Sequence, residues 1–482
     1  MLDNKRCDSR EVLEAHSQCT TQRMAALPVV LCLTDLTETT ELDFSGQTIT
    51  GLGPLSFEAQ RGISLHPTYA VSTDREPLGL LDAWMWARKP KDANGQRSDI
   101  NESLRWIESY ERLAERAVAL PQTRLVQVGD RESDILGLMQ RAQALGWPVD
   151  LLVRSQHNRV VGDNKSLWDE VNAEAVLGEI QFTLGGRDGR KPRVVRQVLR
   201  AKRMRLDHGK HADGAIEMTY VVASEVDAPV GVKPVCWRLL THREVSTSAQ
   251  IIELIDWYRA RWEIGMLFHV LKNGCRVEAL QLASLEKIER ALTLFMVVSW
   301  RIARLMRLGR TCPELPASLM FDPDEIRAAQ VLTNKPMPNE LPSLNDRVRR
   351  VAKLGDFLAR KGDGEPGVKT LWIGLQRVTD FAAGVRFMRL SGDTLGCVSW
   401  DASRGVVILR AYPLMSPSRE ADEILSGSQA WVCSSWQAKK NTKSWTGASS
   451  VDGRDSVISR TRISQARSST RPSSRPSSAS SR

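Results

Sequence analysis

Residues 246–278 carry the most regular hydrophobic pattern in the chain, with apolar side chains recurring at the spacing of a helix. The apolar positions are Ile252, Ile255, Ile264, Leu267 and Leu271. Asn273 and Gly274 follow them, and a glycine just past the last periodic residue commonly ends a helix. We therefore predict one long helix across this stretch.

Polar positions form a second stripe on the same predicted helix. Tyr258, Arg261, Gly265 and Lys272 are separated by three, four and seven residues, offsets that place them on one helical face. Taken alone, such a stripe is typical of a solvated basic face. It becomes more specific when the identity of each position is considered.

The first 155 residues alternate between strand-like and helix-like patterns. We predict that residues 1–27 form a polar, helical N-terminal segment. The predicted strands cover 28–33, 63–71, 78–86, 124–129 and 149–153, and the predicted helices cover 100–120 and 133–145. This alternation predicts an α/β fold, with a mixed sheet flanked by helices over residues 28–155. The order of three strands, helix, strand, helix, strand is that of an RNase H-like fold.

Residues 156–245 change character. Short β-rich runs alternate with turns rich in glycine and aspartate, and they cover 180–184, 194–199, 216–224 and 235–240. We expect an all-β insertion here, placed before the long helix.

The C-terminal part falls into three segments. Residues 246–310 hold the long helix and a following core helix at 285–308. Residues 311–392 form a helical region with a proline-rich connector and an amphipathic helix at 371–390. Residues 393–482 are rich in Ser, Arg and Pro, and we expect a disordered basic tail.

Charge and composition disfavour several classes of protein. The net charge is +10, but residues 437–482 supply +8 of it, so the rest of the chain is nearly neutral. Global charge is therefore weak evidence for a nucleic-acid partner. The eight cysteines are scattered without a Cys-x-x-Cys pair, which disfavours disulfide scaffolds and zinc sites. No apolar run is long enough to span a bilayer and no signal region opens the chain, so we expect a cytoplasmic protein without a membrane partner.

The polar stripe resembles the signature of bacterial insertion-sequence transposases of the DDE type. In the cut-and-paste branch, the insertion sequence four family, this signature is Tyr, two residues, Arg, three residues, Glu, six residues, Lys. Tyr258, Arg261 and Lys272 occupy three of these positions. Gly265 stands at the position of the catalytic Glu. The resemblance covers roughly residues 1–390.

The resemblance implies a metal site built from two aspartates and that glutamate. Asp130, in the text VGDRESDI after a predicted strand, matches the second aspartate. For the first, LCLTDLTETTELDF contains an apparent three-residue insertion, which leaves Asp35 and Glu38 as rival candidates. We prefer Asp35 because it directly follows the apolar strand, and we expect Glu41 and Asp43 in the following loop. Carboxylates suit Mg²⁺ or Mn²⁺, and two such ions can activate a nucleophile and stabilise a leaving oxygen.

The resemblance also implies a set of DNA-binding residues. The residues at the matching positions are Arg154, Trp237, Tyr258, Arg261 and Lys272. Trp237 matches a tryptophan that stacks on a base flipped from the transposon end, and an ordinary strand-core tryptophan is the alternative. An unpaired base stacked on an aromatic ring contributes roughly 1–3 kcal/mol.

These features predict a DNA transposase that cleaves transposon ends and transfers them to target DNA. We expect this copy to be impaired at Gly265 and to lack the family's upstream end-recognising domain, because the match begins near Met1. Its expected partners are DNA and a second transposase subunit, either another copy or an intact transposase. Two alternatives remain: a non-catalytic chain that pairs with and inhibits intact transposase, and an inactive pseudogene product.

Overall fold

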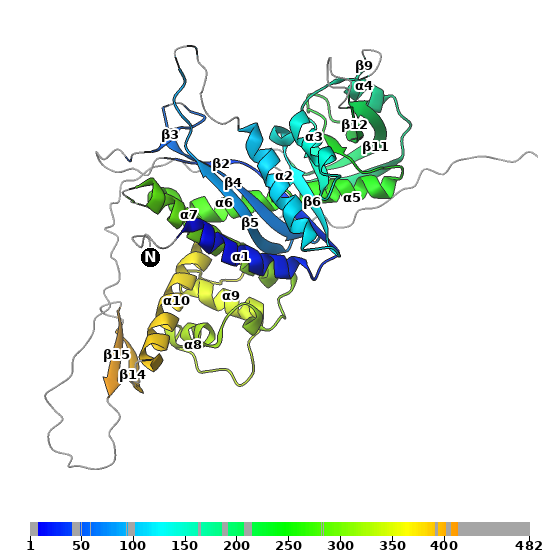
Figure 1. The fold of residues 1–482 in the computed structure, drawn as a ribbon. Helices are drawn as coiled ribbons and strands as arrows, with labels where there is room; N and C mark the ends of the chain where they lie inside the picture. Colours follow the sequence, from blue (N-terminus) through cyan, green and yellow to red (C-terminus); the bar gives the residue numbers. More distant parts are fainter. Residues whose placement is uncertain are drawn as a thin grey trace, which may run out of the picture. The chain divides into compact units, whose positions relative to one another are not determined.

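The computed structural model describes residues 8–40, 49, 51–57, 59–92, 94, 102–161, 165–185, 191–206, 215–280, 282, 284–390, 394–401 and 406–412 (Figure 1). These residues divide into two compact units. The first, here called the core unit, contains Glu14–Glu38 and Leu52–Ile264. The second, the C-terminal unit, contains the described residues from Gly265 onward, together with those of Met1–Leu13 and Thr39–Gly51.

A mixed sheet organises the core unit. Five of its strands are β1 (Val29–Thr34), β4 (Arg61–Ser72), β5 (Pro77–Trp86), β6 (Arg124–Gly129) and β7 (Asp150–Arg154). They lie side by side in the order β5-β4-β1-β6-β7. The β1–β4 and β4–β5 pairs are antiparallel, whereas β1–β6 and β6–β7 are parallel. This topology confirms the predicted RNase H-like sheet. Two short strands, β2 (Thr37–Thr40) and β3 (Gly53–Pro54), follow β1 in the chain.

Helices cover this sheet through an apolar core. They are α2 (Ser103–Val118), the 3-10 turn η1 (Arg131–Ser133) and α3 (Leu136–Ala144). Trp106, Tyr110, Leu138 and Met139 are buried in one cluster with side chains of the strands. The Tyr110 hydroxyl donates a 2.7 Å hydrogen bond to the Val149 carbonyl, which satisfies the one polar atom this ring buries.

The C-terminal half of α1 (Ser9–Met24) packs on β5 in the same unit. Ser17 Oγ donates to the Leu81 carbonyl at 3.0 Å, and the Leu80 N–H donates to His16 Nε2 at 3.1 Å.

The insertion continues the same sheet instead of forming a separate β domain. Its strands β10 (Gly178–Leu184), β11 (Arg193–Leu206), β12 (Ile216–Val226) and β13 (Cys236–Thr241) are antiparallel neighbours, and β13 pairs with β7. The prediction of an all-β insertion was wrong in one respect, because α4 (Leu167–Asn172) lies within it, after the small β8–β9 ladder (Val160–Val161 and Lys165–Ser166).

The predicted long helix is divided. The structure has α5 (Ser248–Arg259), α6 (Trp262–His269), a π-helical turn η3 (Val270–Gly274) and a 3-10 turn η4 (Val277–Ala279). The break occurs because the Arg261 and Ile264 N–H groups bond to carbonyls three residues back, those of Tyr258 and Arg261, instead of four. The predicted end at Gly274 agrees with the end of η3.

The C-terminal unit contains α7 (Leu285–Thr311), η5 (Ala317–Leu319), α8 (Pro323–Leu332), α9 (Leu344–Lys353) and α10 (Val368–Leu390). Helix α10 packs on both α8 and α9. Our prediction of a disordered tail from residue 393 does not hold for its beginning, since β14 (Thr394–Asp401) and β15 (Val406–Tyr412) pair as antiparallel strands. The rest of the predicted tail lies outside the described residues. Within the described part of the chain, no helix is long and apolar enough to cross a membrane.

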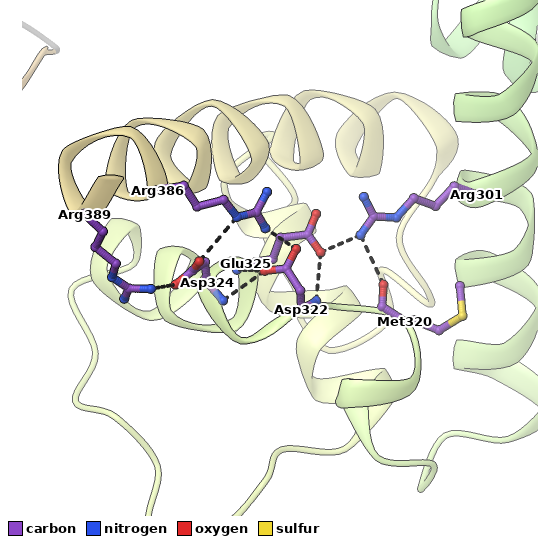
Figure 2. A network of polar contacts seen from close by, with 7 residues as sticks. All are labelled: Arg301, Met320, Asp322, Asp324, Glu325, Arg386 and Arg389. Carbon is purple, nitrogen blue, oxygen red and sulfur yellow. Dashed lines mark hydrogen bonds and ion pairs between the residues drawn. The ribbon is translucent and has the colours of Figure 1, made fainter. Parts of the chain in front are cut away.

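A polar network ties three helices of this unit together (Figure 2). Asp322 begins α8 and accepts the N–H groups of Asp324 and Glu325, both at 2.9 Å, while Glu325 accepts the Asp322 N–H at 3.1 Å. Arg301 of α7 donates to Glu325 at 2.7 Å. From α10, Arg386 pairs with Asp322 and Arg389 donates to Asp324 at 2.7 Å.

Glu325 is the buried member of this network, and its removal should destabilise the unit. Glu325→Ala is expected to lower the free energy of unfolding by about 2 kcal/mol, because the change removes one half of a capping box and leaves Arg301 without its carboxylate. Chemical denaturation measures this loss. Glu340→Ala, at an exposed position without an ion pair in the described part of the chain, should change stability by less than about 0.5 kcal/mol. Equal losses in the two variants would show that the network adds nothing.

Two buried histidines predict a loss of stability in mild acid. Burial, assisted by Arg105, lowers the pKa of His66 from 6.5 to about 3, and burial with Arg23 lowers the pKa of His16 to about 4. Below pH 6.5 the unfolded chain therefore binds protons that the folded chain excludes, so stability falls as pH falls toward 4. The expected slope is about 1.4 kcal/mol per pH unit for each histidine. Denaturation of the natural chain and of His66→Phe between pH 4 and pH 6.5 measures this slope. An unchanged slope in the variant would exclude His66 as a cause.

Candidate functional site

Asp35 and Asp130 stand at neighbouring strand ends in the core unit. Asp35 follows β1, and Asp130 follows β6. Because β1 and β6 are parallel, with Thr34 opposite Gly129, the next residue of each strand leaves the sheet at the same edge. The structure therefore brings together the two aspartates that the sequence singled out.

Arg261 joins the two carboxylates. Its Nη1 lies 2.7 Å from Asp35 Oδ2, and its Nη2 lies 3.3 Å from Asp130 Oδ2. The Tyr258 hydroxyl donates a hydrogen bond of 3.1 Å to Asp130 Oδ1. Only 6% of Arg261 is exposed, so this guanidinium is largely withdrawn from water. Two residues of the polar stripe thus converge on the two aspartates.

The electrostatics are those of an acidic cluster. Burial raises the pKa of Asp35, the positive charge of Arg261 opposes this rise, and the negative charge of Asp130 adds to it. Burial also raises the pKa of Glu132, with further contributions from Asp35 and Asp130. The negative charge of Asp130 thus makes ionisation of Asp35 and Glu132 less favourable, and a bound cation would offset this repulsion.

The rival candidate Glu38 has other partners. Its carboxylate accepts the Ser56 N–H at 3.0 Å and the Ser56 hydroxyl at 2.8 Å, and it pairs with Arg88. Asp35 is the residue that shares Arg261 with Asp130, which supports our preference for Asp35. Glu41 and Asp43 lie outside the described residues.

Gly265 and Lys272 belong to the C-terminal unit. Gly265 is half-buried within α6. Lys272 Nζ lies 3.6 Å from Glu278 Oε1, which also accepts the Thr40 N–H at 3.2 Å. Because glycine has no side chain, position 265 cannot supply a metal ligand.

The residues present fit a divalent cation in part. Carboxylate oxygens are the ligands that Mg²⁺ prefers, and Asp35 and Asp130 already direct one oxygen each at a single cation, the Arg261 guanidinium. Within the described part of the chain, no three His, Cys, Asp or Glu side chains are close enough to hold a metal ion. Two aspartates could therefore hold one ion if Arg261 moves away, but a third carboxylate is missing from the set.

Arg154 and Trp237 line a common open pocket of about 470 Å³ in the core unit. The same pocket is lined by Arg131, Lys233 and Arg238, so it is strongly basic. One face of Trp237 stacks on Phe182, with ring centroids 5.4 Å apart. The pocket therefore combines cationic groups with a partly exposed aromatic ring, the combination that suits an unpaired nucleotide.

Residues 297–395, within the C-terminal unit, match the family model described as the Transposase Tn5 dimerisation domain. The match supports a transposase. Its end near residue 395 agrees with the end of the resemblance inferred from the sequence. Among solved structures, a chain of the piggyBac transposase synaptic complex with hairpin DNA is similar at 8% sequence identity and a TM-score of 0.34. The alignment covers 76% of this chain and 56% of that chain, so this chain spans little more than half the length of that transposase.

Sequence analysis missed several residues of the candidate site. Glu132 adds negative charge to the aspartates, and Arg131 lines the basic pocket. Both directly follow Asp130 in the sequence. The presence of two charged residues next to a candidate metal ligand was the signal that could have identified them. Trp168, which packs under the Arg238 guanidinium at 4.1 Å, comes from the unpredicted helix α4.

Proposed function

We propose that this chain is a DDE-type DNA transposase of the insertion sequence four family whose catalytic site is incomplete. The observation that carries the proposal is the convergence of Asp35 and Asp130 on the cation of Arg261, at the adjoining ends of β1 and β6. Asp35 and Asp130 would hold Mg²⁺ or Mn²⁺. When bound, such an ion would activate the attacking hydroxyl and stabilise the leaving oxygen of the DNA strand.

The remaining residues would bind and orient DNA. Tyr258 and Arg261 would exchange their aspartate partners for a DNA phosphate, which a guanidinium binds through two parallel hydrogen bonds. Arg154 and Trp237 would hold a flipped nucleotide in the basic pocket, with the base stacked on the Trp237 indole. Lys272 would contact the DNA backbone.

Gly265 would limit cleavage. The signature position that should supply a third carboxylate supplies none, so the metal would have fewer ligands and a less defined geometry. The glycine also costs the helix roughly 1 kcal/mol relative to alanine. We therefore expect the natural chain to bind DNA but to cleave it slowly.

Nicking of supercoiled DNA with Mg²⁺ or Mn²⁺ tests this function. The natural chain is expected near background, and Gly265→Glu about tenfold above it, which corresponds to about 1.4 kcal/mol of barrier. Adding Asp130→Ala to the Gly265→Glu chain should return nicking to background. If the natural chain nicks as fast as the Gly265→Glu chain and Asp130→Ala abolishes this activity, another group completes the site.

The match to a dimerisation domain favours a second function, that of a non-catalytic subunit that pairs with and inhibits an active transposase. Mixing tests this alternative. The amount of the Gly265→Glu chain is held fixed and natural chain is added in excess. If mixed pairs are inactive, the added natural chain should reduce the nicking. An excess of the natural chain lacking residues 297–395 is the control and should have no effect.

A further inference from the structure

A basic pocket lies on the C-terminal unit between the end of α8 and one face of α9. We call it the α9 pocket. It measures about 390 Å³ and is lined by Lys335, Arg349, Arg350, Lys353 and Asp346, with Leu332, Thr333 and Leu354 as the remaining walls. Four cationic side chains and one carboxylate thus meet in one open hollow.

Most of this positive charge is not neutralised. Within the described part of the chain, the ammonium groups of Lys335 and Lys353 form no ion pair, and both side chains are exposed. Arg350 reaches Asp346 at only 3.4 Å, and its Nε is buried without a hydrogen-bond partner. Arg349 is the one member with a close carboxylate, that of Glu365 at 3.0 Å. The pocket therefore keeps a clear excess of donors over acceptors.

A fifth cation, Arg347, is close enough to Arg350 of the pocket to be repelled by it. Arg347 is fully buried and donates from Nη1 to the Ile326 carbonyl at 3.1 Å, whereas its Nε and Nη2 have no partner among the described residues. Burial lowers its pKa to about 10, and repulsion from Arg350 adds to this effect. An anion in the α9 pocket would relieve this repulsion, because it would neutralise Arg350.

We propose that the α9 pocket binds the phosphodiester backbone of DNA, as a second contact surface within residues 297–395, the segment that matches the dimerisation-domain model. Arginine and lysine side chains arranged around an open hollow suit a tetrahedral phosphate, since the guanidinium offers paired donors and the ammonium a compact charge. Among the described residues, no aromatic side chain lines the pocket, so it would bind phosphate without stacking on a base. This surface is independent of whether Asp35 and Asp130 cleave DNA.

The test is DNA binding by the full chain, without divalent metal, followed by fluorescence anisotropy at several salt concentrations. Arg350→Gln/Lys353→Gln removes two cations of the pocket. Arg327→Gln/Lys361→Gln removes the same residue types from exposed positions of the same unit that do not line it. The pocket variant is expected to reduce the slope of log affinity against log salt by about 2, since each lost phosphate contact reduces it by about 0.9. The matched variant should leave the slope nearly unchanged.

A further variant and a competing anion test whether the effect comes from DNA binding in the α9 pocket. Lys335→Gln/Lys353→Gln changes only exposed side chains, and should reproduce the effect without affecting the thermal transition. Equal slopes in the pocket and matched variants would overturn the proposal. Loss of inorganic-phosphate binding in the pocket variant without a change in its DNA slope would also overturn it, because the site would then serve the free anion. Because no metal is present, failure of nicking does not affect this outcome.

Discussion

Arg261→Ala is expected to lower the free energy of unfolding by about 2–3 kcal/mol at neutral pH, because two carboxylates would face each other without a cation between them. Breaking a fully buried ion pair costs roughly 3–5 kcal/mol, and the figure here is smaller because both aspartates remain partly exposed. Chemical denaturation of the two chains measures the loss.

The loss should also depend on pH with a definite sign. Arg261 holds down the pKa of Asp35, so its removal should raise that pKa further above the value in the unfolded chain. The resulting penalty exists when the carboxylates are ionised and disappears as they protonate, so the deficit should shrink on acidification. Arg259→Ala removes a half-buried arginine whose ion pair, in the described part of the chain, is with the exposed Asp256 on the same helix, and should cost less than about 0.5 kcal/mol. A pH-independent loss in Arg261→Ala would mean that the residue acts by packing alone.

Arg347→Met is expected to stabilise the chain by about 2 kcal/mol. The arginine is fully buried, makes one hydrogen bond to a carbonyl and leaves two nitrogens unpaired among the described residues. Replacing a buried charge by an apolar side chain of similar volume is often neutral or stabilising by roughly 1–4 kcal/mol. The unpaired state of Arg347 places this case toward the stabilising end.

Denaturation of Arg347→Met and of Arg327→Met measures this effect. Arg327 is exposed on α8, so its replacement should change stability by no more than about 0.5 kcal/mol. Destabilisation by Arg347→Met would show that its unpaired nitrogens are satisfied in solution.

The sheet could be predicted from the sequence because its strands bury continuous apolar runs. Helix α9 was not predicted, although Leu344, Val348 and Val351 have the spacing of one helical face. What the hydrophobic pattern could not predict is the burial of the charged Arg347 beside that face. The break between α5 and α6 was also missed. It depends on a switch from four-residue to three-residue hydrogen bonds, which side-chain periodicity does not report.

The sequence predicted which residues form the candidate site, but it did not predict the contacts between them. Parallel strands that each end at an aspartate predict that Asp35 and Asp130 lie close together. The stripe on the following helix predicted which face Tyr258 and Arg261 share. It could not predict that Arg261 spans both carboxylates, because this depends on the turn at residues 260–261 and on the reach of a long side chain.

The most direct test of the central claim, that Asp35 and Asp130 are the metal-binding carboxylates of an incomplete transposase site, is Mn²⁺ binding followed by electron paramagnetic resonance. The natural chain is expected to bind weakly, and Gly265→Glu to bind about tenfold more tightly, equivalent to about 1.4 kcal/mol. Asp130→Ala should remove the binding from both chains. Unchanged Mn²⁺ affinity in the Asp130→Ala chains would contradict the account.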